Sequence, residues 1–475
     1  MSDLDSPDLA EAKAPPVPVR GDLTQGPVAR TLLLFTLPTL GSNVLQSLNG
    51  SISAIYVGKF LGEQAFAAAG ISAMVIFLIF STVFGLSMAA TILVGQAMGR
   101  RDLDEVRRTI GATTGAFIVV GLVVAIFGHL LAPPILHMLA TPPSAFDHAV
   151  DYLEVVFVGV PIVLVLVLAQ SAMRGVGDAV SPLYATILNL VLSLVLNPLF
   201  IVGFGPVPAL GLPGAALAGV IANLLCVIFL VARTYALDLP IALRGRDLRL
   251  LIPDWAHLRP VMAIGLPMGL SMIVMSASSL VMLGLINREG VETVAAYNAA
   301  TQLWNYIQLP AFAVGSACSA MAAQNIGAGR WDRVSAITRM GVAANLVMTG
   351  VLIAVLVALD HWLLALFLPA ASPAIAIGEH INVLIGWTFV PMGISMVITA
   401  VVRANGAVLA PLLILVFSMI VVRMSLGFGL YPRFGADAIW WSFIASSAAS
   451  AVLAVLYYLG GGWRRLRPQG APVAA

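Results

Sequence analysis

The sequence QAMGRRDLDEV at residues 96–106 returns as QNIGAGRWDRV at residues 324–334, an offset of 228 residues. Three shorter patterns repeat at an offset of 229 residues: Leu37-Pro38 with Leu266-Pro267, Arg174-Gly-x-Gly177 with Arg403-x-x-Gly406, and Pro182 with Pro411. Self-similarity at one fixed spacing is typical of a duplicated structural unit. We therefore predict two halves with the same fold, joined near the middle of the chain.

The composition indicates a membrane protein. Of the 475 residues, 60% are hydrophobic and only 10% are charged, and the mean hydropathy is +1.00. Soluble chains carry about 25% charged residues, so lipid is the solvent that this composition fits. The net charge of +2 gives no reason to expect a nucleic-acid partner. Cys226 and Cys318 lie in apolar runs and predict neither a disulfide nor a metal site.

The apolar segments are long enough to cross a bilayer as helices, which requires about 20 residues each. Because backbone groups in lipid have to hydrogen-bond within their own segment, we predict an all-α membrane protein. Twelve segments qualify, and they cover residues 28–56, 66–97, 108–131, 146–173, 180–203, 211–235, 258–287, 293–324, 335–369, 374–402, 407–430 and 435–460.

The basic residues orient these helices. When both termini are placed in the cytoplasm, most of the 24 basic residues fall on the inner side, whereas the outer side keeps Lys59, Arg288 and Arg433. This asymmetry follows the positive-inside rule. Six spans in each half give both halves the same orientation, so the repeats are parallel and related by an axis along the membrane normal.

The predicted organisation has five parts. A linker containing Arg244, Arg246 and Arg249 beside leucines separates the halves, and we expect it to lie on the inner membrane face as an amphipathic connector. The scarcity of lysine relative to arginine favours a bacterium with a GC-rich genome, and hence its inner membrane. The parts are a disordered cytoplasmic tail (1–27), a six-helix bundle (28–235), the cytoplasmic linker (236–257), a second six-helix bundle (258–460) and a cytoplasmic tail (461–475).

Five motifs in order resemble the multidrug and toxic compound extrusion (MATE) family. They are ISAIYVGKFLG, GQAMGR with its copy AQNIGAGR, MRGVGDAVSPL, LNPLFIVGFG followed by GLPGAALA, and VVRANGAVLAP. The resemblance covers residues 28–460 and implies two six-helix bundles that form a V around a central cleft. It also implies export of small organic, often cationic compounds in exchange for protons or sodium ions, by rocking between outward-open and inward-open states. We expect a monomer that needs no cofactor, with Na⁺ as one candidate coupling ion.

Polar residues inside the spans are the candidates for substrate binding, because such residues are costly in lipid and are usually functional or interhelical. Asn43 and Gln46 share a face of the first span near the midplane, and Asn49 follows them on another face. The eighth span carries AAYNAATQLWNYIQLP at residues 295–310, where amides recur at i, i+4 and i+7. An amide-lined cleft with aromatic residues suits bulky, weakly specific ligands; the competing interpretation is hydrogen bonding between helices. The substrate-binding candidates are Asn43, Gln46, Asn49, Asn298, Gln302, Trp304 and Asn305.

The carboxylates that usually couple ions in this family are missing. The family's first-span Asp corresponds to Ser53 here, and a fifth-span Asp seen in some members corresponds to Asn197. Acidic residues of the seventh and tenth spans correspond to positions near Met275 and Met392. The position of the coupling site is therefore open.

Three explanations for coupling remain. A Ser/Asn chamber in the first half binds sodium through oxygen atoms, protons bind peripheral groups whose pKa changes between states, or the protein is an uncoupled facilitator. The candidates for the chamber are Ser53, Asn189, Ser193 and Asn197, with Asn223 nearby. The candidates for proton binding are Glu154, Glu379 and His380.

Three other functions fit these residues less well. A flippase of lipid-linked sugars from the same superfamily is the runner-up, but such proteins usually have a strongly cationic cavity, and only Arg423 lies well inside a span. We interpret Arg423 as structural. A membrane-embedded enzyme needs a titratable or metal cluster at depth, and the spans contain none. A channel is disfavoured because nothing resembles a selectivity filter.

Overall fold

The computed structural model describes residues 21–139, 141–203, 208–369 and 372–465. Within these ranges the chain is almost entirely helical and contains no strand, as predicted. Eleven helices are long and apolar enough to cross a membrane, and the bent pair α10–α11 raises the number to 12 when it is taken as one span. The all-α membrane fold with twelve spans is confirmed.

The first half contains the first six spans in five helices. Gly62, with φ 80° and ψ −172°, breaks α1 into two spans, which replaces the longer loop expected between residues 56 and 66. The helices are α1 (Val28–Arg100), α2 (Leu103–Met138), α3 (Pro143–Gly175), α4 (Val180–Val202) and α5 (Gly211–Ala236).

The second half repeats this arrangement with more interruptions. The predicted span 335–369 ends early and is followed by a short separate helix, and α10 and α11 meet at an angle of 41°. A π-helical segment, η3 (Phe417–Val422), lies between α12 and α13. The helices are α6 (Trp255–Ile286), α7 (Val291–Gly327), α8 (Trp331–Ala358), α9 (Asp360–Ala365), α10 (Ala374–Gly386), α11 (Phe389–Ala404), α12 (Leu409–Val416), α13 (Arg423–Phe434) and α14 (Ala436–Leu459).

The duplicated motif forms a tight turn between two helices in both halves. In the first copy, Arg101 takes a left-handed conformation (φ 61°) after α1, and the side chain of Asp102 accepts a hydrogen bond from Glu105 N at the start of α2. Such a side-chain cap satisfies a backbone donor that the helix itself leaves free. In the second copy, Gly329 supplies the left-handed residue (φ 71°) between α7 and α8.

The described residues of the two predicted tails and the linker make defined contacts. Residues 1–20 and 466–475 lie outside the described residues, but residues 21–27 are held by hydrogen bonds, and Trp463 is fully buried. The linker contains a 3₁₀ helix, η1 (Gly245–Leu251), whose Leu250 and Leu251 pack on Gly111 and Gly115 of α2. It therefore packs on the first bundle and does not only rest on the membrane.

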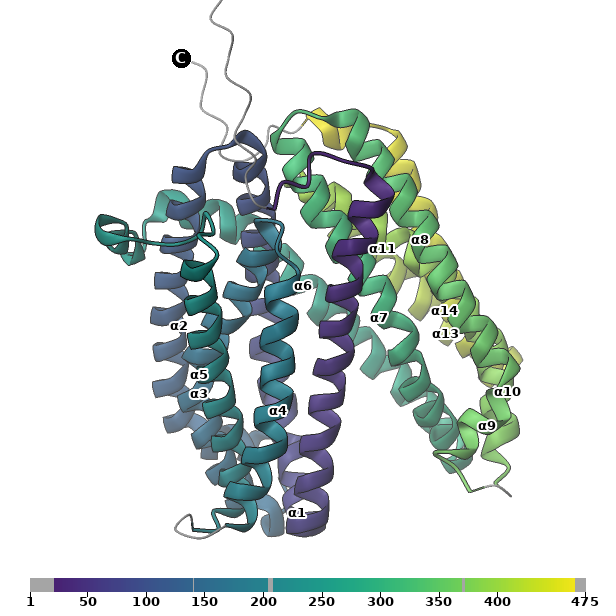
Figure 1. Cartoon of the computed structure of the whole chain (residues 1–475). Coiled ribbons are helices and arrows are strands. Elements are labelled where there is room, and N and C mark those ends of the chain that lie inside the picture. The colour runs from purple at the N-terminus through teal and green to yellow at the C-terminus, as the bar shows by residue number, and fades with distance from the viewer. Residues whose placement is uncertain (1–20, 140, 204–207, 370–371, 466–475) are drawn as a thin grey trace, which may run out of the picture.

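The two halves form two groups of helices that come together at one end and diverge at the other (Figure 1). The start of α1 and the end of α14 lie at the end where the groups meet, and α9 and α10 lie at the opposite end. Figure 1 also shows α1 and α7 along the inner edges of their groups. We name the end where the groups meet the inner end, because the basic turns described above are located there.

Candidate functional site

The inner end is closed by two glutamines that cross between the halves. Gln96 on α1 donates from Nε2 to the carbonyl oxygen of Ala404 (2.7 Å), and Gln324 on α7 donates to that of Gly175 (3.0 Å). Positions 96 and 324 correspond in the repeat, and so do 175 and 404. Each half thus reaches into the same loop of the other half, and both glutamines are fully buried.

Glycines let the two helices approach closely at this point. A Cβ atom at Gly99 would overlap the carbonyl oxygen of Gln324, and a Cβ atom at Gly327 would overlap that of Gln96. Only glycine leaves room for backbone contact of this kind. The duplicated Gln-x-x-Gly motif therefore makes a reciprocal contact, which we call the inner junction: residues 96–99 and 324–327 with loops 174–177 and 403–406.

A strap of residues 21–27 lies across the inner junction before α1 begins. Leu23 N donates to Gln324 Oε1 (2.9 Å), and Arg330 donates to the carbonyl oxygen of Thr24 (2.7 Å). On the other side, Gly21 is in close backbone contact with Gly177 in the first half. The strap therefore contacts both halves where they meet.

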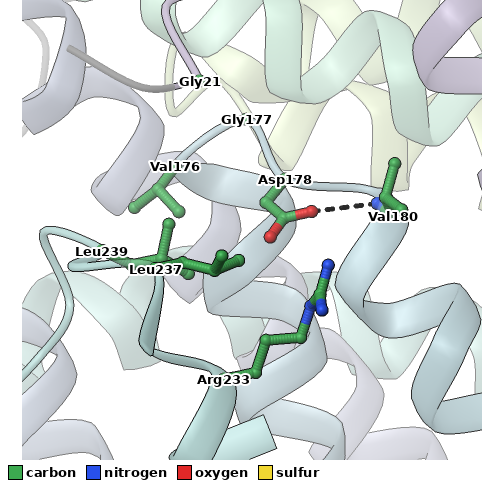
Figure 2. Close-up of a pocket in the computed structure, with 8 residues that line it drawn as sticks. All are labelled: Gly21, Val176, Gly177, Asp178, Val180, Arg233, Leu237 and Leu239. Carbon is green, nitrogen blue, oxygen red and sulfur yellow. Dashed lines mark hydrogen bonds between the residues drawn. The ribbon is translucent and has the colours of Figure 1, made fainter. Parts of the chain in front are cut away.

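A pocket of about 250 Å³ lies beside the strap on the inner surface (Figure 2). Figure 2 shows the side chains of Asp178 and Arg233 near each other, with Val176, Leu237 and Leu239 to their left, and Asp178 accepts a hydrogen bond from Val180 N. Arg233 donates to Ser181 Oγ (2.6 Å), so both charged groups already have partners. None of the predicted substrate residues lines this pocket.

Farther from the inner junction, polar side chains of α1 and α7 are exposed. Gln46 on α1 and the α7 stripe of Asn298, Gln302 and Asn305 are exposed, and Asn43 is half-buried. At 1.5 Å per residue, Gln46 lies roughly 27 Å from the inner end of α1, and Asn305 roughly 33 Å from that of α7. Because amides facing lipid are costly, we assign this polar face to the space between the two groups.

Two of the predicted substrate residues face away from this space. Trp304 is buried in the second half, where its Nε1 donates to Asn382 Oδ1 (2.8 Å) and its ring lies 5.7 Å from that of Tyr297. The exposed aromatic residue of the stripe is Tyr306, which is 46% exposed. Asn49 points into the first bundle, where its Nδ2 donates to Asn189 Oδ1. In this structure Trp304 and Asn49 therefore make their hydrogen bonds within their own halves, and their assignment to the substrate site stays a prediction.

The first half contains a chain of three amides. Asn49 on α1 donates to Asn189 on α4 (2.8 Å), which in turn donates to Asn223 on α5 (2.9 Å). Asn197 instead bonds the carbonyl oxygen of Ser193 on its own helix (2.8 Å). These contacts join helices of one bundle, and none of the groups is titratable. Ser53, one turn beyond Asn49 on α1, is half-buried.

The second half contains a chain of the same length that ends on a carboxylate. Trp304 on α7 bonds Asn382 on α10, and Asn382 Nδ2 donates to Asp360 Oδ1 at the start of α9 (2.7 Å). Asp360 is only 6% exposed. Burial raises the pKa of this carboxyl to about 6; the hydrogen bond from Asn382 acts in the opposite direction. Asp360 is not among the proton-binding candidates predicted from the sequence, because acids at helix ends are usually solvated.

The predicted proton-binding groups lie at the outer rim in ion pairs. Glu379 lies 2.8 Å from His361, and His380 lies 2.9 Å from Asp437. Glu154 lies 3.9 Å from His129. All three are partly exposed, which fits the expected peripheral position.

Arg423 has a structural environment. Its Nε donates to Ser446 Oγ (3.0 Å), and its guanidinium lies 4.3 Å from the ring centre of Phe443. Both partners belong to α14, so the buried cation joins α13 to α14 inside the second half.

Comparisons with known proteins agree with the duplicated fold. The MatE family model matches residues 38–199 and again residues 267–428, one segment in each half. The probable multidrug resistance protein YoeA of Bacillus subtilis is 31% identical over 437 residues, covering 91% of this chain and 93% of the relative. The probable multidrug resistance protein NorM of Thermotoga maritima is 22% identical, covering 92% and 94%.

Solved structures have the same fold. One is a multidrug resistance MATE family transporter in an outward-facing conformation, with a TM-score of 0.85 and 19% identity, covering 93% of this chain and 98% of that chain. Another is a transporter of the MOP superfamily from Pyrococcus furiosus, with a TM-score of 0.85 and 18% identity.

Proposed function

The chain belongs to the MatE family, and we propose that it exports small organic compounds by alternating access in exchange for a cation. The substrates we propose are bulky and often cationic, as for a multidrug exporter. The protein would act as a monomer in the inner membrane of a bacterium, with both termini in the cytoplasm.

The observation that carries this proposal is the reciprocal inner junction beneath an exposed polar stripe. The junction joins the two halves through a few buried amides and glycine contacts. Contacts of this kind form or break as a unit, which a two-state interface requires. The stripe offers amides for hydrogen bonds and Tyr306 for cation–π contact, which tolerates varied ligand shapes.

The closed end is consistent with the direction of transport that we propose. The basic turns lie at the inner end, and the positive-inside rule supports our proposal that this end is cytoplasmic. The structure then corresponds to an outward-facing state, from which an exporter releases its substrate. A flippase with a cationic cavity is not favoured, because Arg423 is bound to Ser446 and Phe443 inside one half.

Transport in proteoliposomes tests the proposal. We would follow rhodamine 6G, a bulky organic cation, under a pH gradient alone and under a sodium gradient alone, with protein-free liposomes as the control. We expect one gradient to drive dye accumulation against its concentration. Saturable dye movement that neither gradient drives would identify an uncoupled facilitator, and the absence of any saturable dye movement would refute the exporter.

A further inference from the structure

We infer that Asp360 binds the proton that drives export, and that Asn382 and Trp304 transmit its protonation state to the substrate helix α7. This inference deepens the proposed antiport and rests on it. It supplies a titratable group in a chain where Ser53 and Asn197 occupy the positions at which the family usually has acids.

The surroundings of Asp360 favour a proton over a fixed charge partner. Asp360 lies in α9, beyond the end of the α8 span, at the outer end of the second half (Figure 1). Its Oδ1 accepts a hydrogen bond from Asn382, whereas its Oδ2 is buried without a hydrogen-bond partner among the described residues. A buried carboxylate oxygen with no donor is costly, and binding a proton there removes the charge.

Asn382 connects this carboxyl to α7 with both ends of its amide. The Nδ2 group donates to Asp360 (2.7 Å) and the Oδ1 atom accepts from Trp304 Nε1 (2.8 Å), so the orientation of the amide is fixed. Asn382 is fully buried. When Asp360 gains a proton, its oxygen becomes a weaker acceptor, and the hydrogen bond that anchors Asn382 and Trp304 weakens.

Trp304 carries this change to the side of α7 that faces the substrate. It lies two residues from Gln302 and one from Asn305, both on the exposed stripe. At 100° per residue, Trp304 is turned about 200° from Gln302, so the two side chains lie on opposite sides of one helix. A shift of the tryptophan within its packed pocket therefore moves the stripe.

The charged groups around Asp360 are few. His361 on α9 and Glu379 on α10 form an exposed pair 2.8 Å apart, and His380 and Asp437 form a second pair at the rim. Of these, Glu379 raises the pKa of Asp360 and His361 lowers it, both less than burial does. From α7 the outer titratable groups are Glu292 and Tyr297, and α8 has its charged residues only near its inner end, at Asp332, Arg333 and Arg339.

The direction of the pKa shift of Asp360 fits an exporter. In the outward-facing state the carrier has to take up a proton from outside, and in the inward-facing state it has to release that proton to the cytoplasm. The raised pKa of Asp360 belongs to the outward-facing state, where uptake is needed. Proton uptake forms an O–H bond at Oδ2 of Asp360 with a proton from external water. This bond breaks when the inner side opens, and the proton passes to water on the cytoplasmic side.

The amide chain of the first half cannot take this role, because Asn49, Asn189 and Asn223 have no titratable proton. Glu154 and Glu379 are partly exposed and paired with histidines, so we expect a conformational change to alter their surroundings less than those of the buried Asp360. Asp360 is therefore the acid whose environment depends most on the packing of the helices.

Asp360→Asn tests the inference, because it keeps the shape and removes the titratable proton. We expect a loss of at least tenfold in rhodamine 6G accumulation driven by a pH gradient. We also expect no proton release when the dye is added to purified protein, whereas dye counterflow without a gradient persists. The matched control is Asp437→Asn, which removes an exposed carboxyl at the same rim and should behave like the wild type.

Asp360→Glu provides a second measurement that is independent of a loss of activity. Dye accumulation by the wild type should rise as the pH on the side of the protein's outer face falls through about 6, because that is where the Asp360 carboxyl becomes protonated. In Asp360→Glu this midpoint should shift while the protein remains folded. An unshifted midpoint, or proton release that persists in Asp360→Asn, overturns the inference.

The outcomes separate this inference from the proposed function. If sodium alone drives the wild type, antiport stands and the role of Asp360 is refuted. If neither gradient drives the wild type, the antiport proposal fails and the inference fails with it.

Discussion

The inner and outer ends of the molecule are held in different ways. At the inner end the two halves contact each other through buried glutamines and glycines, and a strap crosses both. At the outer end the polar pairs, His361 with Glu379 and His380 with Asp437, stay within the second half. Contact between the halves thus includes the inner end, where it has to break during transport, and it continues away from that end where Gly85 of α1 packs on Gly265 and Gly269 of α6.

The largest effect is expected from locking the inner junction. A Cβ atom at Gly95 would lie 2.9 Å from the Cβ of Ala323, so a small separation of the helices brings the pair into the range of about 3.5–4.5 Å that a disulfide needs. We expect oxidised Gly95→Cys/Ala323→Cys to lose transport and to regain it on reduction. Dye transport before and after oxidation measures this.

Single-cysteine variants at the same positions, treated with the same oxidant, are the controls. The native Cys226 and Cys318 are buried and are not expected to react. Full transport by the cross-linked protein would mean that the inner junction does not open.

A smaller but measurable shift is expected from removing one glutamine. Gln96→Leu leaves the carbonyl oxygen of Ala404 without this donor, and an unsatisfied buried polar group costs about 1–3 kcal/mol. The inner-closed population should therefore fall by about 5- to 150-fold relative to the inner-open one. Spin labels at Lys59 and Glu292, both exposed at the outer end, should report a shorter distance as the outer ends approach.

Gln324→Leu should have a similar effect, because Gln324 makes the equivalent bond in the repeat. The control is Gln25→Leu, whose side chain bonds Asp22 within the strap. Distances that stay unchanged in both glutamine variants, with transport intact, would show that the crossing bonds do not hold the inner end closed.

The fold could be predicted from the sequence because several independent patterns, spread over the whole chain, support the same arrangement of spans. The offset of 228–229 residues, the hydropathy and the basic turns all agree, and an error in one span would have reversed the charge pattern. The sequence did not predict that the Gln-x-x-Gly motif forms a contact between the halves. A repeated motif does not show which backbone groups its side chains will bond.

The site was only partly predictable. Helical spacing correctly grouped Asn298, Gln302 and Asn305 on one face, but the same spacing turns Trp304 to the opposite side, and the prediction ignored this. Asp360 was not among the candidates, because its burial depends on α10, and its hydrogen-bond partner Asn382 lies 22 residues farther along the chain. The helix that buries a given residue is determined by tertiary packing. The residues on either side of it in the sequence do not reveal which helix that is.

A moderate effect is expected from the exposed stripe. Gln302→Ala removes an exposed amide that makes no contribution to the inner junction, so we expect a change of a few-fold in the apparent KM that differs between dyes. The wild type and Gln302→Ala should be compared with rhodamine 6G and with a second, uncharged dye. Equal values for both dyes would remove α7 from the substrate site.

The smallest effect is expected from the amide chain of the first half, which joins three helices of a single bundle and does not cross the inner junction. Asn223→Ala removes the acceptor of Asn189, and interhelical hydrogen bonds in membranes contribute about 0.6 kcal/mol on average. We therefore expect a slightly lower unfolding temperature, measured by heating the purified protein, with coupling unchanged. Since these oxygens are also the remaining candidates for sodium binding, a selective loss of sodium-driven transport would contradict this expectation and move the coupling site from the second half to the first.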